Sequence, residues 1–331
     1  MNANHGWLAW ITSRLRQLFR RAPAPGRWIE GGVFTFAGFV GVHPLAWPKR
    51  SYRLYLPQGF RKRDRKALIV FLHGCKQTSA EFAQGTRVTA FADANSALVL
   101  MPQQSESANR YGCWNWFDRR TVNGYGEAAI VAKMIEKIAK RFSVERESVA
   151  AGGISAGGSL AAILGLRYPD LIGNVFVHSG VACGASASPY AALSVMQRGP
   201  DTDVARIGIV ARRSAEAEVR LLAIHGAMDD VVAPRHALAL AKQYLAFNGI
   251  EVPSGGPSTL PNADVDTSDA STLPHTTRTR EWRRGDVALV RLVEVEWLAH
   301  AWSGGDPALP FNNGAPPDAM RLVGDWLATS R

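Results

Sequence analysis

The sequence predicts an α/β fold, in which a mostly parallel central sheet carries helices on both of its faces. Short apolar runs that suit buried strands alternate along the chain with longer segments of helical period. One of these runs, residues 149–151, leads into Gly153-Ile154-Ser155-Ala156-Gly157, and a segment of small residues with helical spacing follows. The chain has 331 residues, of which 47% are hydrophobic and 20% charged, so it can bury the core of one large domain.

Residues 6–21 are predicted to form a basic amphipathic helix, which precedes the main domain. Apolar side chains fall on one stripe and arginines occupy much of the other side; the apolar positions are Trp7, Ile11, Leu15 and Leu18. Such a helix either lies on an anionic membrane or a hydrophobic particle, or packs against the domain or a partner. Its apolar stretch is too short for a secretory signal. With the Pro-rich linker that follows, this segment covers residues 1–26.

Residues 27–331 are expected to form a single α/β domain, which opens with an edge hairpin in the glycine-rich stretch 31–42. The predicted strands are residues 52–56, 67–72, 97–101, 148–152, 175–178, 221–224 and 288–298. The predicted helices are residues 127–142, 235–247 and 317–328, besides the segment after Ser155. Residues 253–279 are rich in Pro, Ser, Thr, Gly and Asp, and they predict a long flexible loop inserted at the surface.

The stretch around Ser155 has the Gly-x-Ser-x-Gly pattern of a nucleophile elbow, a sharp strand-to-helix turn that exposes a serine. The glycines make room for close neighbours while the serine adopts a strained backbone conformation. The alternative is a turn rich in glycine and serine that has no chemistry. A serine hydroxyl needs a base to take its proton, and the base needs an acid to orient it. The partners of Ser155 therefore decide between the two interpretations.

The candidate acid and the candidate base each follow a predicted strand. Their order along the chain, serine then acid then histidine, is the order required when such a site is built on a doubly wound hydrolase sheet. Asp229 comes just after the strand predicted at 221–224 and is the preferred acid. Asp230 is the fallback, although it fits a helix cap better. His300 follows the last predicted strand and is the preferred base.

The other histidines fit the role of base less well. His225 precedes the acid on the same strand end and cannot readily reach around it. His236 is expected to face solvent near a helix start, and His275 lies in the predicted flexible loop. Several others come before the elbow.

A tetrahedral intermediate also needs backbone N–H groups directed at its oxygen. Ala156, the residue after the serine, is expected to provide one of them. Cys75, in the turn after an early strand, is expected to provide the other, and Gly74 lets the backbone turn tightly there. The alternative for this turn is an ordinary strand-to-loop connection.

Aromatic residues gather in two short stretches and predict an apolar wall beside the nucleophile. They are Trp114, Trp116, Phe117 and Trp302. Packing in the core is the alternative for each, and it is the expected role of Trp116. Trp114 and Trp302, together with His73, are candidate contacts of the substrate.

Composition narrows the class of partner. The formal net charge of +10 favours acidic partners or anionic surfaces, but no helix-turn-helix, zinc-ligand or aromatic RNA-binding pattern indicates nucleic acid. The three cysteines, Cys75, Cys113 and Cys183, do not have the spacing of a zinc site. One disulfide with one free thiol, and three free thiols, are both open. No cofactor or metal is expected.

Five stretches resemble the polyhydroxybutyrate depolymerase-like esterases. They are His73-Gly74-Cys75-Lys76-Gln77, Cys113-Trp114-Asn115-Trp116-Phe117, Gly153-Ile154-Ser155-Ala156-Gly157, His178-Ser179-Gly180 and His300-Ala301-Trp302-Ser303-Gly304-Gly305. The resemblance implies an α/β-hydrolase fold and hydrolysis of carboxylic esters, with Ser155, Asp229 and His300 as the triad. It also implies a disulfide between Cys75 and Cys113 and an oxidising, extracellular compartment. Because no convincing signal sequence is visible, the cytoplasm is the alternative compartment.

The predicted function is that of a serine esterase, which cleaves short-chain hydroxyalkanoate polyesters or oligomers through an acyl-enzyme. Relatives with the same core imply feruloyl or acetyl esters of plant polysaccharides as alternative substrates. Acyl transfer to an alcohol would use the same residues. A protein that binds granules or membrane surfaces, with a vestigial hydrolase fold, is an alternative of another class. The intact order of serine, acid and histidine argues against it.

Overall fold

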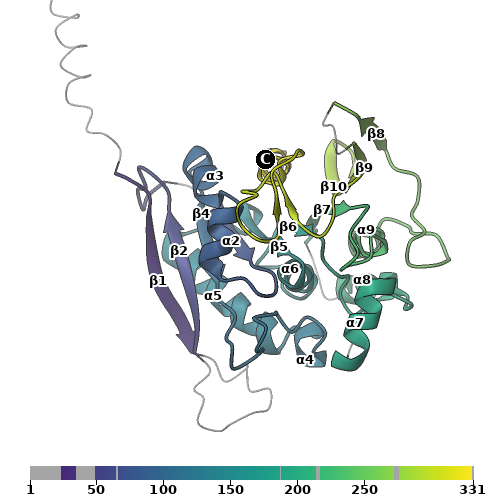
Figure 1. Cartoon of the computed structure of the whole chain (residues 1–331), viewed down its shortest axis with the longest axis horizontal. Helices are drawn as coiled ribbons and strands as arrows, with labels where there is room; N and C mark the ends of the chain where they lie inside the picture. The colour runs from purple at the N-terminus through teal and green to yellow at the C-terminus, as the bar shows by residue number, and fades with distance from the viewer. Residues whose placement is uncertain are drawn as a thin grey trace, which may run out of the picture.

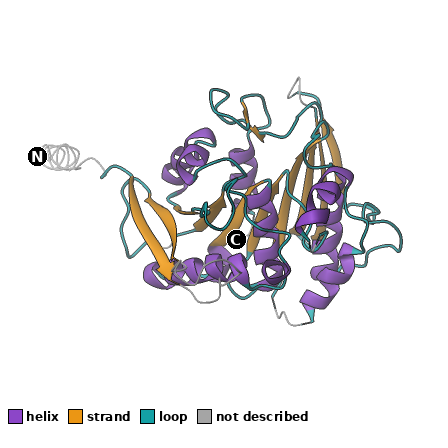
Figure 2. Ribbon diagram, turned by 60° about the horizontal axis from the view of Figure 1, so that its bottom comes forward, coloured by secondary structure: helices purple, strands orange, loops and turns teal. Residues whose placement is uncertain are grey.

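The computed structural model describes residues 24–34, 49–64, 66–186, 188–213, 217–271 and 276–329. Within these ranges the chain folds around one sheet of ten strands, with helices packed on both faces (Figures 1 and 2). The strand order is β1-β2-β4-β3-β5-β6-β7-β10-β9-β8. The basic helix predicted at residues 6–21 lies outside the described residues.

The strands of this sheet are β1 (Arg27–Phe34), β2 (Lys49–Leu56), β3 (Leu68–Leu72), β4 (Leu98–Pro102), β5 (Val149–Ile154), β6 (Asn174–His178), β7 (Arg220–Gly226), β8 (Val265–Asp269), β9 (Thr277–Arg284) and β10 (Val287–Val295). The helices are α2 (Ser79–Gly85), α3 (Val88–Asn95), α4 (Arg119–Val122), α5 (Gly126–Phe142), α6 (Ala156–Arg167), α7 (Pro189–Arg198), α8 (Val204–Arg212), α9 (Arg235–Phe247) and α10 (Ala319–Ala328). A 3-10 turn, η2 (Arg146–Ser148), precedes β5, and β11 (Trp302–Ser303) pairs with β12 (Asn312–Asn313) outside the main sheet.

The centre of the sheet is parallel, as the sequence predicts. Strands β4, β3, β5, β6, β7 and β10 pair in parallel, each with its neighbour. Antiparallel strands close both ends, β1 and β2 on one side and β8 and β9 on the other (left and upper right in Figure 1). The carboxyl ends of the parallel strands meet at one edge, which is where α/β proteins build their sites.

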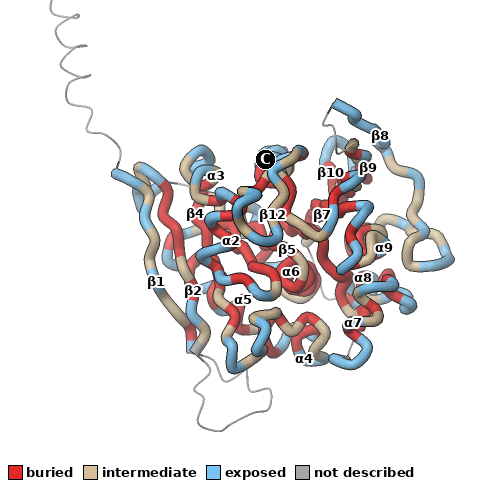
Figure 3. Tube along the Cα trace, viewed as in Figure 1, coloured by how far each residue is buried: buried red, intermediate tan, exposed pale blue. Residues whose placement is uncertain are grey.

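The core has two layers, one on each face of the sheet. In β3 all five residues are buried, and successive side chains alternate between the faces. Leu68, Val70 and Leu72 pack in the cluster that includes α5, α6 and α9, whereas Ile69 and Phe71 pack with α3 and α10. Buried residues accordingly fill the centre of the molecule (Figure 3). A strand that is buried on both faces has apolar side chains at every position. It therefore appears in the sequence as a continuous apolar run, and this run is what predicts the strand.

Most of the hairpin predicted at residues 31–42 lies outside the described residues, and its first four residues belong to a longer antiparallel pairing. β1 begins at Arg27 and pairs along its whole length with β2, so that Arg27 lies opposite Leu56 and Phe34 opposite Lys49. The chain between Phe34 and Lys49 is outside the described residues.

The prediction of a flexible loop at residues 253–279 is wrong for residues 265–269 and 277–279, which belong to strands β8 and β9. Residues 265–269 form β8, which pairs with β9 so that Val265 lies opposite Glu281 and Asp269 opposite Thr277. Four of the five residues of β8 are polar (Asp, Thr, Ser, Asp), and most of them are exposed. The strand gives no apolar signal because it lies at the end of the sheet and covers no core.

Three histidines in the described part of the domain are fully buried, and burial lowers the pKa of each. The pKa falls to about 4 for His73, about 3 for His178 and about 4 for His236. The expectation that His236 faces solvent is wrong. Its Nε2 donates a hydrogen bond to the carbonyl oxygen of Val195 at 2.9 Å, because α7 covers the start of α9.

Acid should destabilise the fold through these histidines. Above a pH of about 6.5 they are neutral in both the folded and the unfolded chain, so their contribution to stability is constant there. Between about 6.5 and about 4 only the unfolded chain takes up their protons. The free energy of unfolding should then fall by roughly 1.4 kcal/mol per pH unit for each buried histidine.

Urea denaturation at pH 7.5, 6.0 and 5.0 measures this slope. In the variant His236→Leu the slope should be smaller by roughly 1.4 kcal/mol per pH unit, since one titrating group is gone. An unchanged slope would contradict the assignment of His236 as a buried neutral imidazole.

Candidate active site

Ser155 lies at the turn between β5 and α6 with a strained backbone. Its φ is 55° and its ψ is −122°, a combination that residues with a side chain rarely adopt. Its N–H donates to the carbonyl oxygen of His178 at 2.9 Å, which fixes the turn to the neighbouring strand β6. The elbow geometry predicted from the sequence is therefore present.

The glycines of the elbow are required by close backbone contacts. A Cβ atom on Gly153 would lie 2.1 Å from the carbonyl oxygen of Leu72. A Cβ atom on Gly157 would lie 2.2 Å from the same oxygen and 2.5 Å from that of His73. Because the obstructing atoms are backbone atoms, no change of rotamer could relieve the contact. The turn thus packs directly against the end of β3.

Asp229 and His300 form a hydrogen-bonded pair at the carboxyl ends of β7 and β10. His300 Nδ1 donates to Asp229 Oδ2 at 2.8 Å. The other carboxylate oxygen, Oδ1, accepts the N–H groups of Val231 at 3.0 Å and Val232 at 2.8 Å. β7 and β10 are adjacent parallel strands, with Val295 opposite Gly226, so the two loops start side by side. The fallback acid Asp230 is exposed and takes no part in this arrangement.

The Asp229 carboxyl is held ionised by its neighbours. Burial alone would raise its pKa, but hydrogen bonds and charge from His225 and His300 lower the pKa well below its usual range. His225 is poorly placed to act as the base, as its position in the sequence indicates. The structure gives it another contact, since its Nε2 donates to the carbonyl oxygen of Val232 at 2.8 Å and lies 3.3 Å from Asp229 Oδ2.

Ser155 reaches the same edge of the sheet as the acid and the histidine. Among the described residues its hydroxyl has no hydrogen-bond partner, so the serine–histidine contact is not closed in this conformation. Catalytic hydrogen bonds of this kind are often long without substrate and tighten when it binds. Asp229 and His300 are in contact, and all three residues that the sequence nominates lie at this edge, each after a different parallel strand.

Two backbone N–H groups are available where the oxyanion donors are predicted. Among the described residues, neither Cys75 nor Ala156 has an acceptor for its N–H. The N–H of Gly74, by contrast, is occupied by Gln77 Oε1 at 2.9 Å. Cys75 and Cys113 form a disulfide, as the resemblance implies. Cys183 is a buried free thiol.

The predicted wall of exposed aromatic side chains is wrong for its two main members. Trp114 and Trp302 are each only 1% exposed. The ring of Trp302 packs against those of Phe71 and His178, with centroids 5.2 and 5.0 Å apart, and so belongs to the core. His73 is also fully buried. Trp116 is buried, as expected.

His73 is engaged on both sides of its ring, so it is not available to a substrate in this conformation. Its Nδ1 contacts the carbonyl oxygen of Gly74 at 2.8 Å, and its Nε2 accepts the N–H of Gln104 at 3.2 Å. The side chain instead links the end of β3 to the loop that follows β4.

Exposed apolar side chains do occur beside the acid and the histidine, at positions that the sequence analysis missed. Met228 is 56% exposed and precedes Asp229. Trp297 is 61% exposed, lies three residues before His300 and has a positive φ of 62°. No local signal marks Trp297, because it follows the apolar alternation of β10 without a break.

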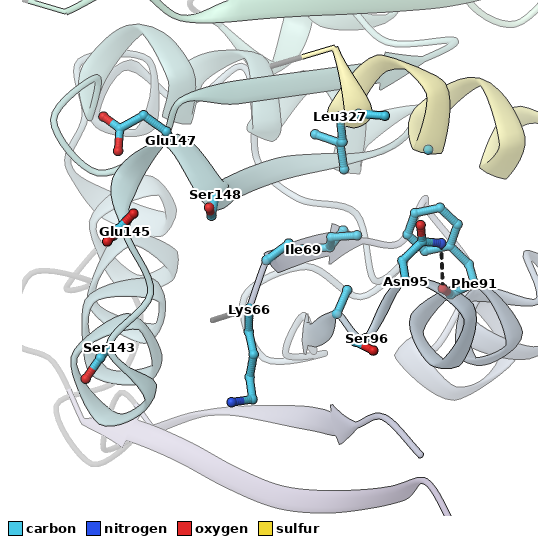
Figure 4. Close-up of a pocket in the computed structure, with 14 residues that line it drawn as sticks. Lys66, Ile69, Phe91, Asn95, Ser96, Ser143, Glu145, Glu147, Ser148 and Leu327 are labelled. Atoms are coloured by element: carbon cyan, nitrogen blue, oxygen red, sulfur yellow. Dashed lines mark hydrogen bonds between the residues drawn. The ribbon is translucent and has the colours of Figure 1, made fainter. Parts of the chain in front are cut away.

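A cavity of about 590 Å³ lies at the opposite edge of the sheet, at the amino ends of β3, β4 and β5. Figure 4 shows its lining, which includes Lys66, Ser96, Ser143 and Ser148. Since Ser148 precedes β5 and Ser155 follows it, the cavity and Ser155 are on opposite edges of the sheet. The cavity therefore takes no part in the site.

The part of the chain that the structure describes contains no cluster of three or more histidine, cysteine or acidic residues that could hold a metal ion. None of its helices is long and apolar enough to cross a membrane.

A family model described as Esterase PHB depolymerase matches residues 50–258. The chain belongs to this family. The match includes Ser155 and Asp229 and ends before His300, whose position rests on the structure of β10 and the loop after it.

Curated relatives come from bacteria and fungi. Poly(3-hydroxyalkanoate) depolymerase C of Paucimonas lemoignei is 28% identical over 189 residues, which are 56% of this chain and 45% of that protein. Feruloyl esterase B of Neurospora crassa is 27% identical over 212 residues, which are 61% of this chain and 72% of that protein. The chain thus aligns with less than half of the depolymerase. Among solved structures, an acetyl xylan esterase from Aspergillus awamori has a TM-score of 0.68 at 17% identity, and covers 91% of this chain and 99% of its own. That likeness shows a shared fold.

The close packing of the elbow predicts that Gly157→Ala is strongly destabilising. The new methyl group would meet two carbonyl oxygens of the β3 end, so the turn or the strand must shift, at a cost of about 3 kcal/mol. The free energy of unfolding from urea denaturation measures the effect. Gly256→Ala is the control, because a Cβ atom there meets nothing within 4 Å. Equal stability of the two variants would contradict the packing described.

Proposed function

We propose that this chain is a serine esterase, which hydrolyses carboxylic esters through an acyl-enzyme on Ser155. The observation that carries the proposal is the 2.8 Å hydrogen bond between His300 Nδ1 and Asp229 Oδ2, at the sheet edge where the elbow presents Ser155. An ionised carboxylate on Nδ1 fixes the histidine tautomer whose Nε2 can accept a proton. Membership of the Esterase PHB depolymerase family supports the reaction type.

Each residue has a distinct role in this reaction. Ser155 Oγ attacks the ester carbonyl while His300 takes its proton, and Asp229 stabilises the imidazolium that forms. The N–H groups of Cys75 and Ala156 bind the oxyanion. His300 returns the proton to the leaving alcohol. Water then attacks the acyl-enzyme, and His300 again acts as the base.

The substrate class that we propose is short-chain hydroxyalkanoate polyesters or their oligomers. Feruloyl and acetyl esters of plant polysaccharides are the alternative, since a curated relative is a feruloyl esterase with similar identity. A panel of amorphous polyhydroxybutyrate, hydroxybutyrate oligomers, methyl ferulate and short p-nitrophenyl esters separates the two classes. Including a competing alcohol reveals acyl transfer.

Replacing the nucleophile should abolish hydrolysis without unfolding the protein. Ser155→Ala should lower kcat/KM on p-nitrophenyl butyrate by at least about 10⁴-fold, because no acyl-enzyme can form. A fluorophosphonate probe should label the wild type at Ser155 and leave the variant unlabelled. Ser96→Ala, at the opposite edge of the sheet, serves as the control. Retained activity of Ser155→Ala, or labelling of another serine, would refute the proposed function.

We also propose that the basic side of the domain contacts anionic lipid. The N–H of Gly59 donates to the carbonyl oxygen of Ala24 at 2.8 Å, so the basic N-terminal sequence joins the domain at this loop. Arg61, Lys62 and Arg63 follow directly and are exposed. The described chain therefore begins beside an exposed basic loop, where each cation contributes about 1 kcal/mol to binding an anionic surface.

Reversing these three charges should weaken lipid binding. The triple variant Arg61→Glu, Lys62→Glu, Arg63→Glu should cosediment with phosphatidylserine liposomes at least tenfold less than the wild type. Binding of the wild type should also fall with salt, since exposed charges are screened. Equal binding of variant and wild type would contradict the proposal. A preference for polyester granules over anionic liposomes would replace lipid with the granule surface.

A further inference from the structure

The turn that carries Cys75 is held in place from outside by the loop after β4. The disulfide joins Cys75 to Cys113. Next to the disulfide, the N–H of Lys76, one residue after Cys75, donates to the carbonyl oxygen of Tyr111, two residues before Cys113, at 2.8 Å. The position of the Cys75 N–H therefore depends on how firmly residues 104–116 are held.

A buried carboxylate at the start of α5 holds that loop. Glu127 is only 6% exposed and accepts three hydrogen bonds. Its Oε1 accepts from Gln104 Nε2 at 2.6 Å and from Asn115 Nδ2 at 2.8 Å, and its Oε2 accepts from the N–H of Asn115 at 2.6 Å. Both ends of the loop thus bind one side chain.

The hydrogen bonds of Gln104 also reach two neighbours of the turn that carries Cys75. Gln104 Nε2 also donates to the carbonyl oxygen of Cys113 at 2.9 Å, and the N–H of Gln104 donates to His73 Nε2 at 3.2 Å. Cys113 is the disulfide partner of Cys75, and His73 precedes the turn in sequence. Glu127 is therefore connected to the turn from both sides, through Asn115 and through Gln104.

The chemistry of this cluster requires an acceptor at position 127. Every hydrogen-bonding neighbour of the carboxylate is an N–H donor, so neither oxygen has an acceptor to which a proton could be directed. Burial raises the pKa of Glu127, and the hydrogen bonds from Gln104 and Asn115 and the charge of Arg50 oppose that rise. A buried carboxylate is costly unless such partners satisfy it.

We propose that Glu127 is a positioning residue for the oxyanion hole. It fixes the loop 104–116, and through the disulfide and the Lys76–Tyr111 hydrogen bond it fixes the N–H of Cys75 at the place where the oxyanion develops. This inference rests on the proposed function, because it assigns Glu127 to the same site. The residue touches neither the substrate nor the reacting atoms.

Glu127→Gln tests this role with almost no change of volume. The amide places an NH₂ group against donors and removes one acceptor, so the loop and Cys75 should shift. Loss of an oxyanion donor costs 10²–10³ in kcat, and a displacement of about 1 Å costs about 10²-fold. We expect kcat on p-nitrophenyl butyrate to fall by about 10- to 100-fold while KM changes by less than about threefold. Affinity for a trifluoromethyl ketone, which needs the oxyanion hole, should fall in parallel with kcat.

Exchanging the two partners provides a rescue. In the double variant Asn115→Asp, Glu127→Gln the new amide can donate to the new carboxylate, which restores a hydrogen bond between positions 115 and 127. The kcat of the double variant should recover by several-fold or more over Glu127→Gln alone. Glu136→Gln, an exposed glutamate on the same helix, is the matched control and should behave as wild type.

A measurement that does not use activity separates this inference from the proposed function. Amide hydrogen exchange at residues 75–77 and 113–115 should be faster in Glu127→Gln than in the wild type and slower again in the double variant. If Glu127→Gln keeps wild-type kcat and wild-type exchange, the positioning role is refuted while the esterase proposal stands. If kcat and KM change together without rescue, Glu127 is only a structural residue. If Ser155→Ala stays active, the proposed function fails whatever Glu127 does.

Discussion

The turn after β5 packs on two carbonyl oxygens at the end of β3, and the candidate site depends on this contact. At Gly153 and Gly157 the elbow lies so close to the carbonyl oxygen of Leu72 that no side chain would fit between them. Because β3 and β5 are adjacent parallel strands, the turn that follows each of them emerges at the same edge. The contact therefore places the turns that carry Ala156 and Cys75, whose N–H groups have no acceptor among the described residues, at the same edge of the sheet as Ser155. Strain at Ser155 is retained because the surrounding backbone leaves no alternative path.

The acid and the histidine depend on a second pair of neighbouring strands. Asp229 and His300 are 71 residues apart in sequence, yet each follows a strand of the β7–β10 pair directly. The N–H groups of Val231 and Val232 and the ring of His225 satisfy the rest of the carboxylate. A charge buried in this way stays ionised, and it can stabilise a histidine cation without taking up its proton.

The central strands could be predicted, and the candidate site residues nominated, because both leave a local trace in the sequence. A strand buried on both faces is a continuous apolar run, and the three site residues each follow such a run in a fixed order. The sequence carries no comparable trace of what covers a side chain. His236 was expected in solvent, but α7 lies over it, and α7 was not among the predicted helices. Trp302 lies beside the base in sequence, yet the short pairing of β11 with β12 turns its ring into the core.

The polar character of β8 has a consequence for the outer border of the sheet. Among the described residues, one side of β8 has no neighbouring strand, and an edge of this kind offers N–H and C=O groups to a strand of another molecule. Charged residues at Asp266 and Asp269, with little apolar area, make such an addition unfavourable. The polar composition of β8, which gives no strand signal in the sequence, therefore also protects the folded protein against edge-to-edge aggregation.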